Sequence, residues 1–233
     1  MNVFDFDAVI FDLDGVIVDT AKYHYLAWRE LAADLGFEFL EEHNERLKGV
    51  SRMASLEILL EVGGLSLPLE EKERLAAKKN NKYMEYIDAL TKDDLLPGAR
   101  ELVEKLRARG IKTAIGSASK NAITILDKLG VSSLFDAIID GNKAELAKPD
   151  PQVFLLAAQE VGVSPVRCIV FEDALAGIEA ARAAGMSVVA VGTHENLHGA
   201  DDYVSGLETI FVFLAKSFPT RISTGKLSRE VSL

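Results

Sequence analysis

The sequence of 233 residues predicts an α/β fold with a Rossmann-like parallel sheet core and an inserted all-helical cap domain. Over most of the chain, short runs rich in β-branched residues alternate with helical patterns. This alternation is typical of a parallel sheet that helices cover on both faces. One long segment, residues 20–93, carries helical patterns without a convincing strand, which predicts a separate helical unit inserted after the first strand.

The predicted strands are short apolar runs, assigned by their length and composition. They cover residues 8–13, 112–116, 137–140, 168–171 and 188–191. The first core helix is predicted in PGARELVEKLRARG, which has Pro97 near its start and Gly110 at its end, as many helices do. Further core helices are predicted over residues 121–129, 151–161 and 174–184.

The inserted segment includes the helical stretches KYHYLAWRELAADLG and LEEKERLAAKKNNKYMEYIDAL. An insertion joins the core at two points, here expected near residues 18–20 and 93–97, and two such hinges suit a lid that opens and closes. We expect a core domain of residues 1–19 and 94–217, a helical cap of residues 20–93, and a polar peripheral tail of residues 218–233.

Composition and charge argue against several classes of protein. The formal net charge is −10 and no basic cluster stands out, which argues against a nucleic-acid partner. No window approaches the roughly 18 apolar residues of a membrane span, and the N-terminal segment does not resemble a secretory signal, so we expect a cytoplasmic protein without a membrane anchor. Cys168 is the single cysteine, which excludes an internal disulfide and a cysteine-rich metal site.

Two acids follow the first predicted strand. Side chains alternate along a strand, so Asp12 and Asp14 share one side while Leu13 points to the other, and Gly15 then turns the chain. A D-x-D pair at a strand end is by itself more often turn or capping chemistry than catalysis. However, unpaired buried carboxylates are costly to desolvate, and this pair therefore calls for a compensating charge.

Other predicted strands also end in polar residues. Ser117 and Ser119 follow the second strand, Lys148 lies in LAKPD beyond the third, and Glu172 and Asp173 follow the fourth. Ligands of open α/β sheets bind beyond the carboxyl ends of the strands, so these side chains are expected to meet Asp12 and Asp14 in one crevice. Alone, Ser117 would usually cap a helix, and Lys148 would usually be a solvated loop lysine.

Carboxylates that share a crevice repel one another and raise each other's pKa unless a cation lies between them. Oxygen ligands at this density suit Mg²⁺. We expect Asp12, Asp14 and Asp173 to hold the ion, Asp14 through its side chain or its main-chain carbonyl, with Glu172 as an outer or alternative ligand. Ser117 and the amides that follow it would form an anion site, to which Lys148 adds a point charge.

These residues together resemble the motifs of the haloacid dehalogenase-like superfamily of phosphotransferases. The match comprises D-x-D-G-V at residues 12–16, Ser117, Lys148 with Pro149, and Glu172 with Asp173, and it spans nearly the whole core. The resemblance implies that Asp12 is a nucleophile that becomes an aspartyl phosphate, that Asp14 is the general acid and base, and that Mg²⁺ is required.

Repulsion is the main obstacle to such a reaction. At ~4 Å and an effective dielectric of about 20, each pair of like unit charges costs ~4 kcal/mol, so a carboxylate that meets a phosphate dianion faces roughly 8 kcal/mol. This would slow the step by roughly five to six decades. Mg²⁺ and Lys148 are expected to cancel the repulsion, while Asp14, beside ionised Asp12, would hold a proton more readily and pass it to the leaving hydroxyl.

The cap distinguishes a mutase from a hydrolase, because a mutase that works through a bisphosphate must bind a second phosphate far from the metal. LKGVSR places Lys48 and Arg52 near the crevice if the cap closes, and arginine suits phosphate recognition. The segments DGVIVDTAKYHYLAW, LKGVSR, KKNNKY, SASKN and EDALAGIEAA are similar to the phosphosugar mutases of this superfamily, which interconvert β-glucose 1-phosphate and glucose 6-phosphate through β-glucose 1,6-bisphosphate.

That resemblance implies further roles in and around the cap. Arg52 would hold the distal phosphate, and the sugar would be lined by Lys48, Gly49, Val50 and Ser51. Cap closure would be coupled to Asp14 by Thr20, His24 and Lys79. The transferring phosphate would be held by Ser117, Ala118, Asn121 and Lys148. His24 and Trp28, four residues apart on one helical face, fit packing as well as substrate contact.

Three functions therefore stay open from the sequence. The leading one is a Mg²⁺-dependent phosphosugar mutase that acts as a monomer on a small-molecule substrate. A sugar-phosphate phosphatase would share the same core motifs, and a catalytically silent sugar-phosphate sensor would keep the binding residues alone. Intact Asp12 and Asp14 argue against the sensor.

Overall fold

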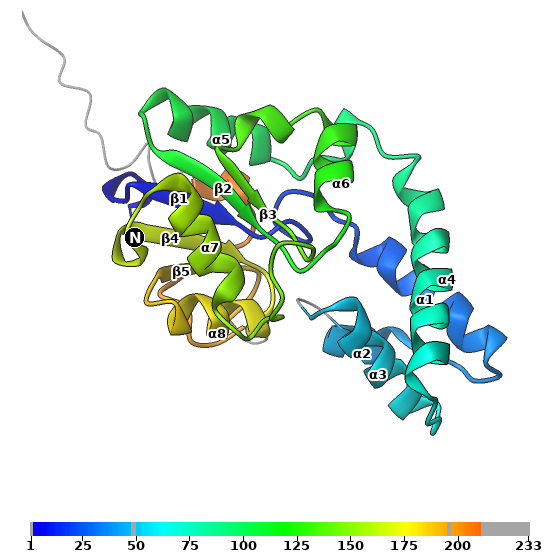
Figure 1. Ribbon diagram of the computed structural model, residues 1–233. Helices are drawn as coiled ribbons and strands as arrows, with labels where there is room; N and C mark the ends of the chain where they lie inside the picture. The colour runs from blue at the N-terminus through cyan, green and yellow to red at the C-terminus, as the bar shows by residue number, and fades with distance from the viewer. Residues whose placement is uncertain (1, 48–49, 195–196, 211–233) are drawn as a thin grey trace, which may run out of the picture.

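A computed structural model describes residues 2–47, 50–194 and 197–210 (Figure 1). Its centre is a parallel sheet of six strands in the order β3-β2-β1-β4-β5-β6. The strands are β1 (Ala8–Phe11), β2 (Lys112–Gly116), β3 (Ala137–Ile139), β4 (Cys168–Glu172), β5 (Ser187–Val191) and β6 (Asp202–Val204). This confirms the predicted fold class and all the predicted strands; β6, a three-residue edge strand, was missed.

Helices cover both faces of the sheet, and β1 is therefore buried on both sides. Val9 and Phe11 pack into one hydrophobic cluster with α5 (Ala99–Ala108) and α6 (Ala122–Leu129). Ala8 and Ile10 pack into a second cluster with α7 (Gln152–Val161) and α8 (Leu175–Ala183). These bounds lie within one or two residues of the predicted ones, and the predicted Pro97–Gly110 segment loses its two ends to turns.

The strand order places the carboxyl end of β1 at a switch point. From β1 the sheet continues through β2 on one side and through β4 on the other. In the register, Phe11 is opposite both Ile115 and Phe171. The residues that follow these three positions in the chain therefore meet at one edge of the sheet, which is where open α/β sheets bind ligands.

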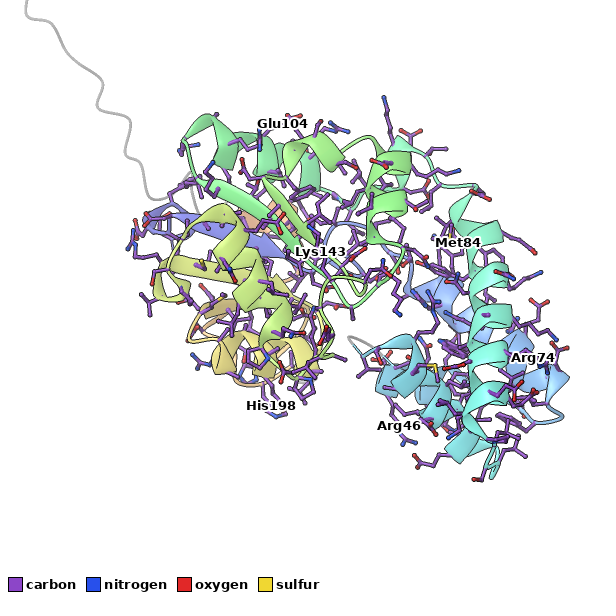
Figure 2. The ribbon with its side chains drawn as sticks, viewed as in Figure 1. Arg46, Arg74, Met84, Glu104, Lys143 and His198 are labelled. Carbon is purple, nitrogen blue, oxygen red and sulfur yellow. The ribbon has the colours of Figure 1, made fainter. Side chains whose placement is uncertain are left out.

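In the described part of the chain, four α-helices lie between β1 and β2 ahead of α5, and we call them the cap helices. They are α1 (Ala21–Asp34), α2 (Glu41–Asn44), α3 (Arg52–Val62) and α4 (Leu69–Ile87). The described residues between 20 and 93 contain no strand, in line with the prediction. In Figure 1 the cap helices lie to one side of the sheet, and Figure 2 labels Arg74 and Met84 on α4.

The cap helices have a hydrophobic cluster of their own. Trp28 and Leu31 of α1 pack there with Leu56 and Leu59 of α3 and Leu75 of α4. The two chain segments that join the cap to the core lie side by side, since Val18 and Leu95 form an antiparallel bridge and the N–H of Leu96 donates to the carbonyl of Ile17 at 2.9 Å. Two adjacent connections of this kind suit a hinge.

Two further predictions concern the rest of the chain. The predicted tail, residues 218–233, lies outside the described residues. In the part of the chain that the structure describes, no helix combines the length and the apolar character that crossing a membrane requires.

The cap cluster predicts a local stability effect. Leu59 is fully buried, whereas Leu69, also in the cap, is 65% exposed. Leu59→Ala should lower the free energy of unfolding by about 2–5 kcal/mol, because it removes buried methyl groups and leaves a cavity. Leu69→Ala is the control and should change it by less than about 0.5 kcal/mol. Urea denaturation followed by circular dichroism measures both, and equal effects would contradict the assignment of a packed cap core.

Candidate active site

The carboxylate of Asp12 lies at the carboxyl end of β1 in a buried ion pair. Lys148 Nζ donates to Asp12 Oδ1 at 2.5 Å and to Glu172 Oε2 at 2.8 Å, and all three side chains are at most 7% exposed. Burial lowers the pKa of Lys148, but the charges of Asp12 and Glu172 outweigh it and raise that pKa above its ordinary value. Lys148 is therefore a permanent cation between two acids from different strands.

Two glycines make room for the acids that follow β4. A Cβ on Gly177 would lie 2.0 Å from Cδ of Glu172, and a Cβ on Gly15 would lie 2.0 Å from Oδ2 of Asp173. Gly15 also has a φ of +79°, which favours glycine over other residues. The turn after Asp14 can thus pass directly beside Asp173, so that the ends of β1 and β4 share one small volume.

Asp12, Glu172 and Asp173 form a cluster that fits a divalent cation. One carboxylate oxygen from each lies within 4.8 Å of the others. Lys148 supplies an ammonium to two of these carboxylates, those of Asp12 and Glu172. Burial, then the charge of Asp12, raise the pKa of Glu172 to about 7. Oxygen donors of this kind suit Mg²⁺.

Asp14 lies apart from that cluster of carboxylates. Its Oδ1 accepts a hydrogen bond from the hydroxyl of Thr20, which in turn accepts one from Tyr83 at 3.1 Å. Burial, then the neighbouring charge of Asp12, raise the pKa of Asp14 to about 7, against the lowering effect of the Thr20 hydrogen bond. A carboxyl group with this pKa can both give and take a proton near neutral pH.

The loop after β2 supplies neutral hydrogen-bonding groups to the same edge. Ser117 is buried, and its Oγ accepts from the N–H of Ser119 at 3.1 Å. Asn121 does not cap its own helix; its Nδ2 instead donates to Oδ1 of Asn80 on α4 at 2.9 Å. This hydrogen bond joins the core directly to the cap beside the acidic cluster.

His24 and Lys79 form a pair on the cap side of the cleft, with Lys79 buried and His24 half-buried. Lys79 Nζ lies 2.7 Å from His24 Nδ1, and also above the rings of Trp28 and Tyr83 at 4.6 and 4.8 Å from their centroids. Burial, then the charge of Lys79, hold the pKa of His24 well below its ordinary value, so its imidazole is neutral and can accept from Lys79. Tyr83 links this pair, through Thr20, to Asp14.

The segment around Arg52 begins α3. Ser51 caps the helix, since its Oγ accepts from the N–H of Ala54 at 3.2 Å. Arg52 and Val50 line the cleft between cap and core, and burial lowers the pKa of Arg52 from its ordinary value. Among the described residues no carboxylate pairs with the guanidinium of Arg52. The predicted ligands Lys48 and Gly49 lie outside the described residues.

The cleft encloses about 830 Å³, including space open to solvent. Of the predicted site residues, the structure brings together around it Asp12, Asp14, His24, Trp28, Val50, Arg52, Lys79, Ser117, Ala118, Asn121 and Asp173. Thr20, Lys148 and Glu172 are buried behind this surface.

Several lining residues were not predicted: Ala21, Asn44, Leu47, Ser55, Asn80, Ser119 and Lys120, although Ser119 was noted as a polar strand end. Signals for two of them existed. Lys120 lies within SASKN, and Ser55 lies three residues after Arg52 on the same face of α3. Asn44 and Asn80 carry no local pattern, because their place at the cleft depends on how the cap helices pack.

Comparisons of sequence and of structure with known proteins agree with each other. A family model described as haloacid dehalogenase-like hydrolase matches residues 6–185. The chain is 46% identical over 196 residues to the beta-phosphoglucomutase of Bacillus subtilis, which covers 83% of this chain and 87% of that protein. It is 32% identical to a phosphorylated carbohydrates phosphatase of Thermotoga maritima, covering 90% and 94% of the two chains. The crystal structure of beta-phosphoglucomutase from Clostridium difficile matches with a TM-score of 0.86 and 46% identity, over 91% and 96%.

The buried ion pair predicts a stability loss that depends on pH. Lys148→Met leaves Asp12 and Glu172 facing each other without a cation, and breaking such a pair should cost about 3–5 kcal/mol at pH 8 in EDTA. The folded-state pKa of Glu172 is already raised to about 7, and removing the ammonium raises it further, so protonation of Glu172 stabilises the folded variant and the loss shrinks as pH falls toward 5.

Thermal or urea unfolding at pH 5 and pH 8 measures this loss. Lys72→Met is the matched control, since Lys72 pairs with Glu57 at the surface at 2.7 Å and should contribute less than about 1 kcal/mol. A Lys148→Met loss that is equal at the two pH values would contradict this electrostatic account.

Proposed function

The chain belongs to the haloacid dehalogenase-like hydrolase family, and on that premise we propose that it is a β-phosphoglucomutase. It interconverts β-D-glucose 1-phosphate and glucose 6-phosphate through an aspartyl phosphate and β-glucose 1,6-bisphosphate. The proposal follows the 46% identity to the Bacillus subtilis enzyme and the structural match to the Clostridium difficile enzyme. We further propose a monomeric, cytoplasmic enzyme that acts on a small phosphosugar.

The observation that carries this proposal is the presence of two anion-binding walls on one cleft. The core wall holds Ser117 and, behind it, Lys148 beside Asp12. The cap wall holds Arg52, whose guanidinium has no carboxylate partner among the described residues. A simple phosphatase requires one phosphate site, whereas a bisphosphate that turns around within the cleft requires two. Arginine is suited to the second because its planar fork binds phosphate oxygens in pairs.

Asp12 is the nucleophile and Asp14 the proton carrier. In one half-reaction a carboxylate oxygen of Asp12 attacks the phosphorus of the C1 phosphate of β-glucose 1,6-bisphosphate. The P–O bond to the sugar breaks, and Asp14 gives its proton to the departing oxygen, which releases glucose 6-phosphate. In the other half-reaction the 6-hydroxyl of β-glucose 1-phosphate gives its proton to Asp14 and takes the phosphoryl group from Asp12. A pKa of about 7 for Asp14 suits both directions of proton transfer.

The acidic cluster is the place for Mg²⁺. We assign the ion to Asp12, Asp14 and Asp173, with Asp14 contributing its main-chain carbonyl because its carboxylate is bound to Thr20, and with Glu172 as an alternative ligand. When bound, Mg²⁺ neutralises the charge that develops on the phosphoryl oxygens. Lys148 holds Asp12 oriented, and Thr20, through Tyr83, links Asp14 to the His24 and Lys79 pair of the cap.

A phosphatase of the same family is the second candidate. The Thermotoga maritima phosphatase is 32% identical over 90% of this chain, and the core site would serve hydrolysis equally well. An assay with β-glucose 1-phosphate and a trace of β-glucose 1,6-bisphosphate separates the two. A mutase forms glucose 6-phosphate with little free phosphate, whereas free phosphate released as fast as glucose 6-phosphate appears would favour the phosphatase. The same assay with α-glucose 1-phosphate tests the anomer.

Removing the nucleophile should abolish turnover. Asp12→Asn keeps the size of the side chain and a hydrogen-bonding oxygen for Lys148, so the fold should persist, but the amide cannot form an aspartyl phosphate. We expect no detectable glucose 6-phosphate and a native circular dichroism spectrum. Asp173→Asn serves as comparison and should instead raise the Mg²⁺ concentration needed for activity. Residual turnover by Asp12→Asn above about one part in a thousand would exclude Asp12 as the nucleophile.

Loss of the cap arginine should affect the mutase reaction selectively. Arg52→Ala removes the distal anion site, so kcat/KM for the mutase reaction should fall by about 100-fold or more. Hydrolysis of a small ester such as p-nitrophenyl phosphate, which has no distal phosphate, should change less than about threefold. Arg46→Ala is the control, since Arg46 is exposed and pairs with Glu61 at 2.8 Å. An equal loss in both reactions would refute the second anion site.

A further inference from the structure

The loop after β2 has two main-chain N–H groups that are free to bind an anion. The N–H of Ser117 donates to the carbonyl of Ile139 at 2.9 Å, that of Ser119 to Ser117 Oγ, and that of Asn121 to Ser119 Oγ at 3.3 Å. Among the described residues, the N–H groups of Ala118 and Lys120 have no acceptor. Both residues line the cleft.

The turn that follows β3 contacts the carbonyl side of this loop. The N–H of Gly141 donates to the carbonyl of Ser119 at 3.2 Å. Nδ2 of Asn142 donates to the carbonyl of Lys120 at 2.9 Å. Neither Gly141 nor Asn142 lines the cleft, so the turn supports the loop from behind. Figure 2 labels Lys143, the next residue of this turn.

The hydrogen bond from Gly141 determines where the N–H of Lys120 points. The C=O of Ser119 and the N–H of Lys120 belong to one peptide unit, which is trans because the cis bond of the described chain is at Lys148-Pro149. In a trans peptide the C=O and N–H point in opposite directions. Because Gly141 holds the C=O of Ser119 on the turn side, the N–H of Lys120 points away from the turn.

Asn142 fixes the next peptide unit in the same way. It binds the C=O of Lys120, while the N–H of Asn121 in that peptide donates to Ser119 Oγ. Lys120 is thus held through the peptide on each side of its Cα. Buried Asp140 in turn holds Asn142, since Asp140 Oδ1 accepts from the N–H of Asn142 at 3.0 Å and Asp140 Oδ2 accepts from its Nδ2 at 2.9 Å.

Steric fit points to the same arrangement. A Cβ on Gly141 would lie 2.3 Å from the carbonyl oxygen of Ala118, and φ of Gly141 is not positive. Backbone conformation therefore does not demand glycine at this position. Glycine is required instead by the close approach of the turn to the loop, since any side chain would push the Ala118 carbonyl away.

We propose that Gly141 and Asn142 are positioning residues for phosphate binding, which direct the N–H of Lys120 at an oxygen of the substrate phosphate. This role rests on the proposed function. Gly141 and Asn142 do not line the cleft themselves, so they would act through the loop after β2. The ligand chemistry is that of a phosphoryl oxygen, because main-chain N–H donors in a concave loop bind anions without contributing a charge.

Calorimetric titration with inorganic phosphate in Mg²⁺ buffer tests this role. Asn142→Ala should bind phosphate about tenfold more weakly than the wild type, since one well-aimed hydrogen bond to a charged group is lost. Its melting temperature should stay within about 3 °C of the wild type, because the side chain is exposed. Lys143→Ala is the matched control: it keeps both main-chain contacts to Asp140 and loses a surface ion pair with Glu160, so phosphate affinity should not change.

Kinetics provide a second readout. Asn142→Ala should raise KM for β-glucose 1-phosphate about tenfold and leave kcat within threefold. Gly141→Ala should raise KM further, and if that variant does not fold, the Asn142 result alone decides. A folded Asn142→Ala protein that binds phosphate within twofold of the wild type would overturn the proposal. If the wild type binds phosphate yet only hydrolyses sugar phosphates, the mutase assignment fails, while the two binding constants still decide the role of Asn142.

Discussion

The ammonium of Lys148 between Asp12 and Glu172 is the interaction on which the rest of the site depends. It allows two strands to end in acids within a buried volume, which would otherwise cost several kcal/mol for each unpaired charge. Even with Lys148 in place, burial and then the charge of Asp12 raise the pKa of Glu172 to about 7. Asp12, Glu172 and Asp173 bring carboxylate oxygens within 4.8 Å of one another, an arrangement that fits a divalent cation.

The fold supplies the geometry that this charge arrangement needs. Because β1 lies between β2 and β4, the acids after β1 and β4 and the neutral loop after β2 meet at one edge of the sheet. The cap adds Arg52, His24 and Lys79 to the lining of the cleft, with Lys79 Nζ 2.7 Å from His24 Nδ1. The Asn80–Asn121 hydrogen bond and the paired connecting segments place the cap against the core.

Much of the core could be predicted from sequence because its signals are local. Asp12 and Asp14 after an apolar run, and Glu172 and Asp173 after another, indicate both a strand and its carboxyl end. Edge strand β6 was missed because its three residues are half-buried and lack an apolar pattern. Asn44, Asn80 and the turn at Gly141 were missed for a different reason: their contacts join segments far apart in the chain, such as Asn142 to Lys120, and no local pattern encodes them.

A crystal structure of the protein grown with Mg²⁺ and a phosphosugar or a phosphate analogue tests the central claim most directly. We expect a cation in contact with carboxylate oxygens of Asp12 and Asp173. The ammonium of Lys148 should still be bound to Asp12, and the phosphorus should lie in line with the other oxygen of Asp12. A structure in which no cation touches Asp12, or in which its side chain turns away from the cleft, would contradict this claim.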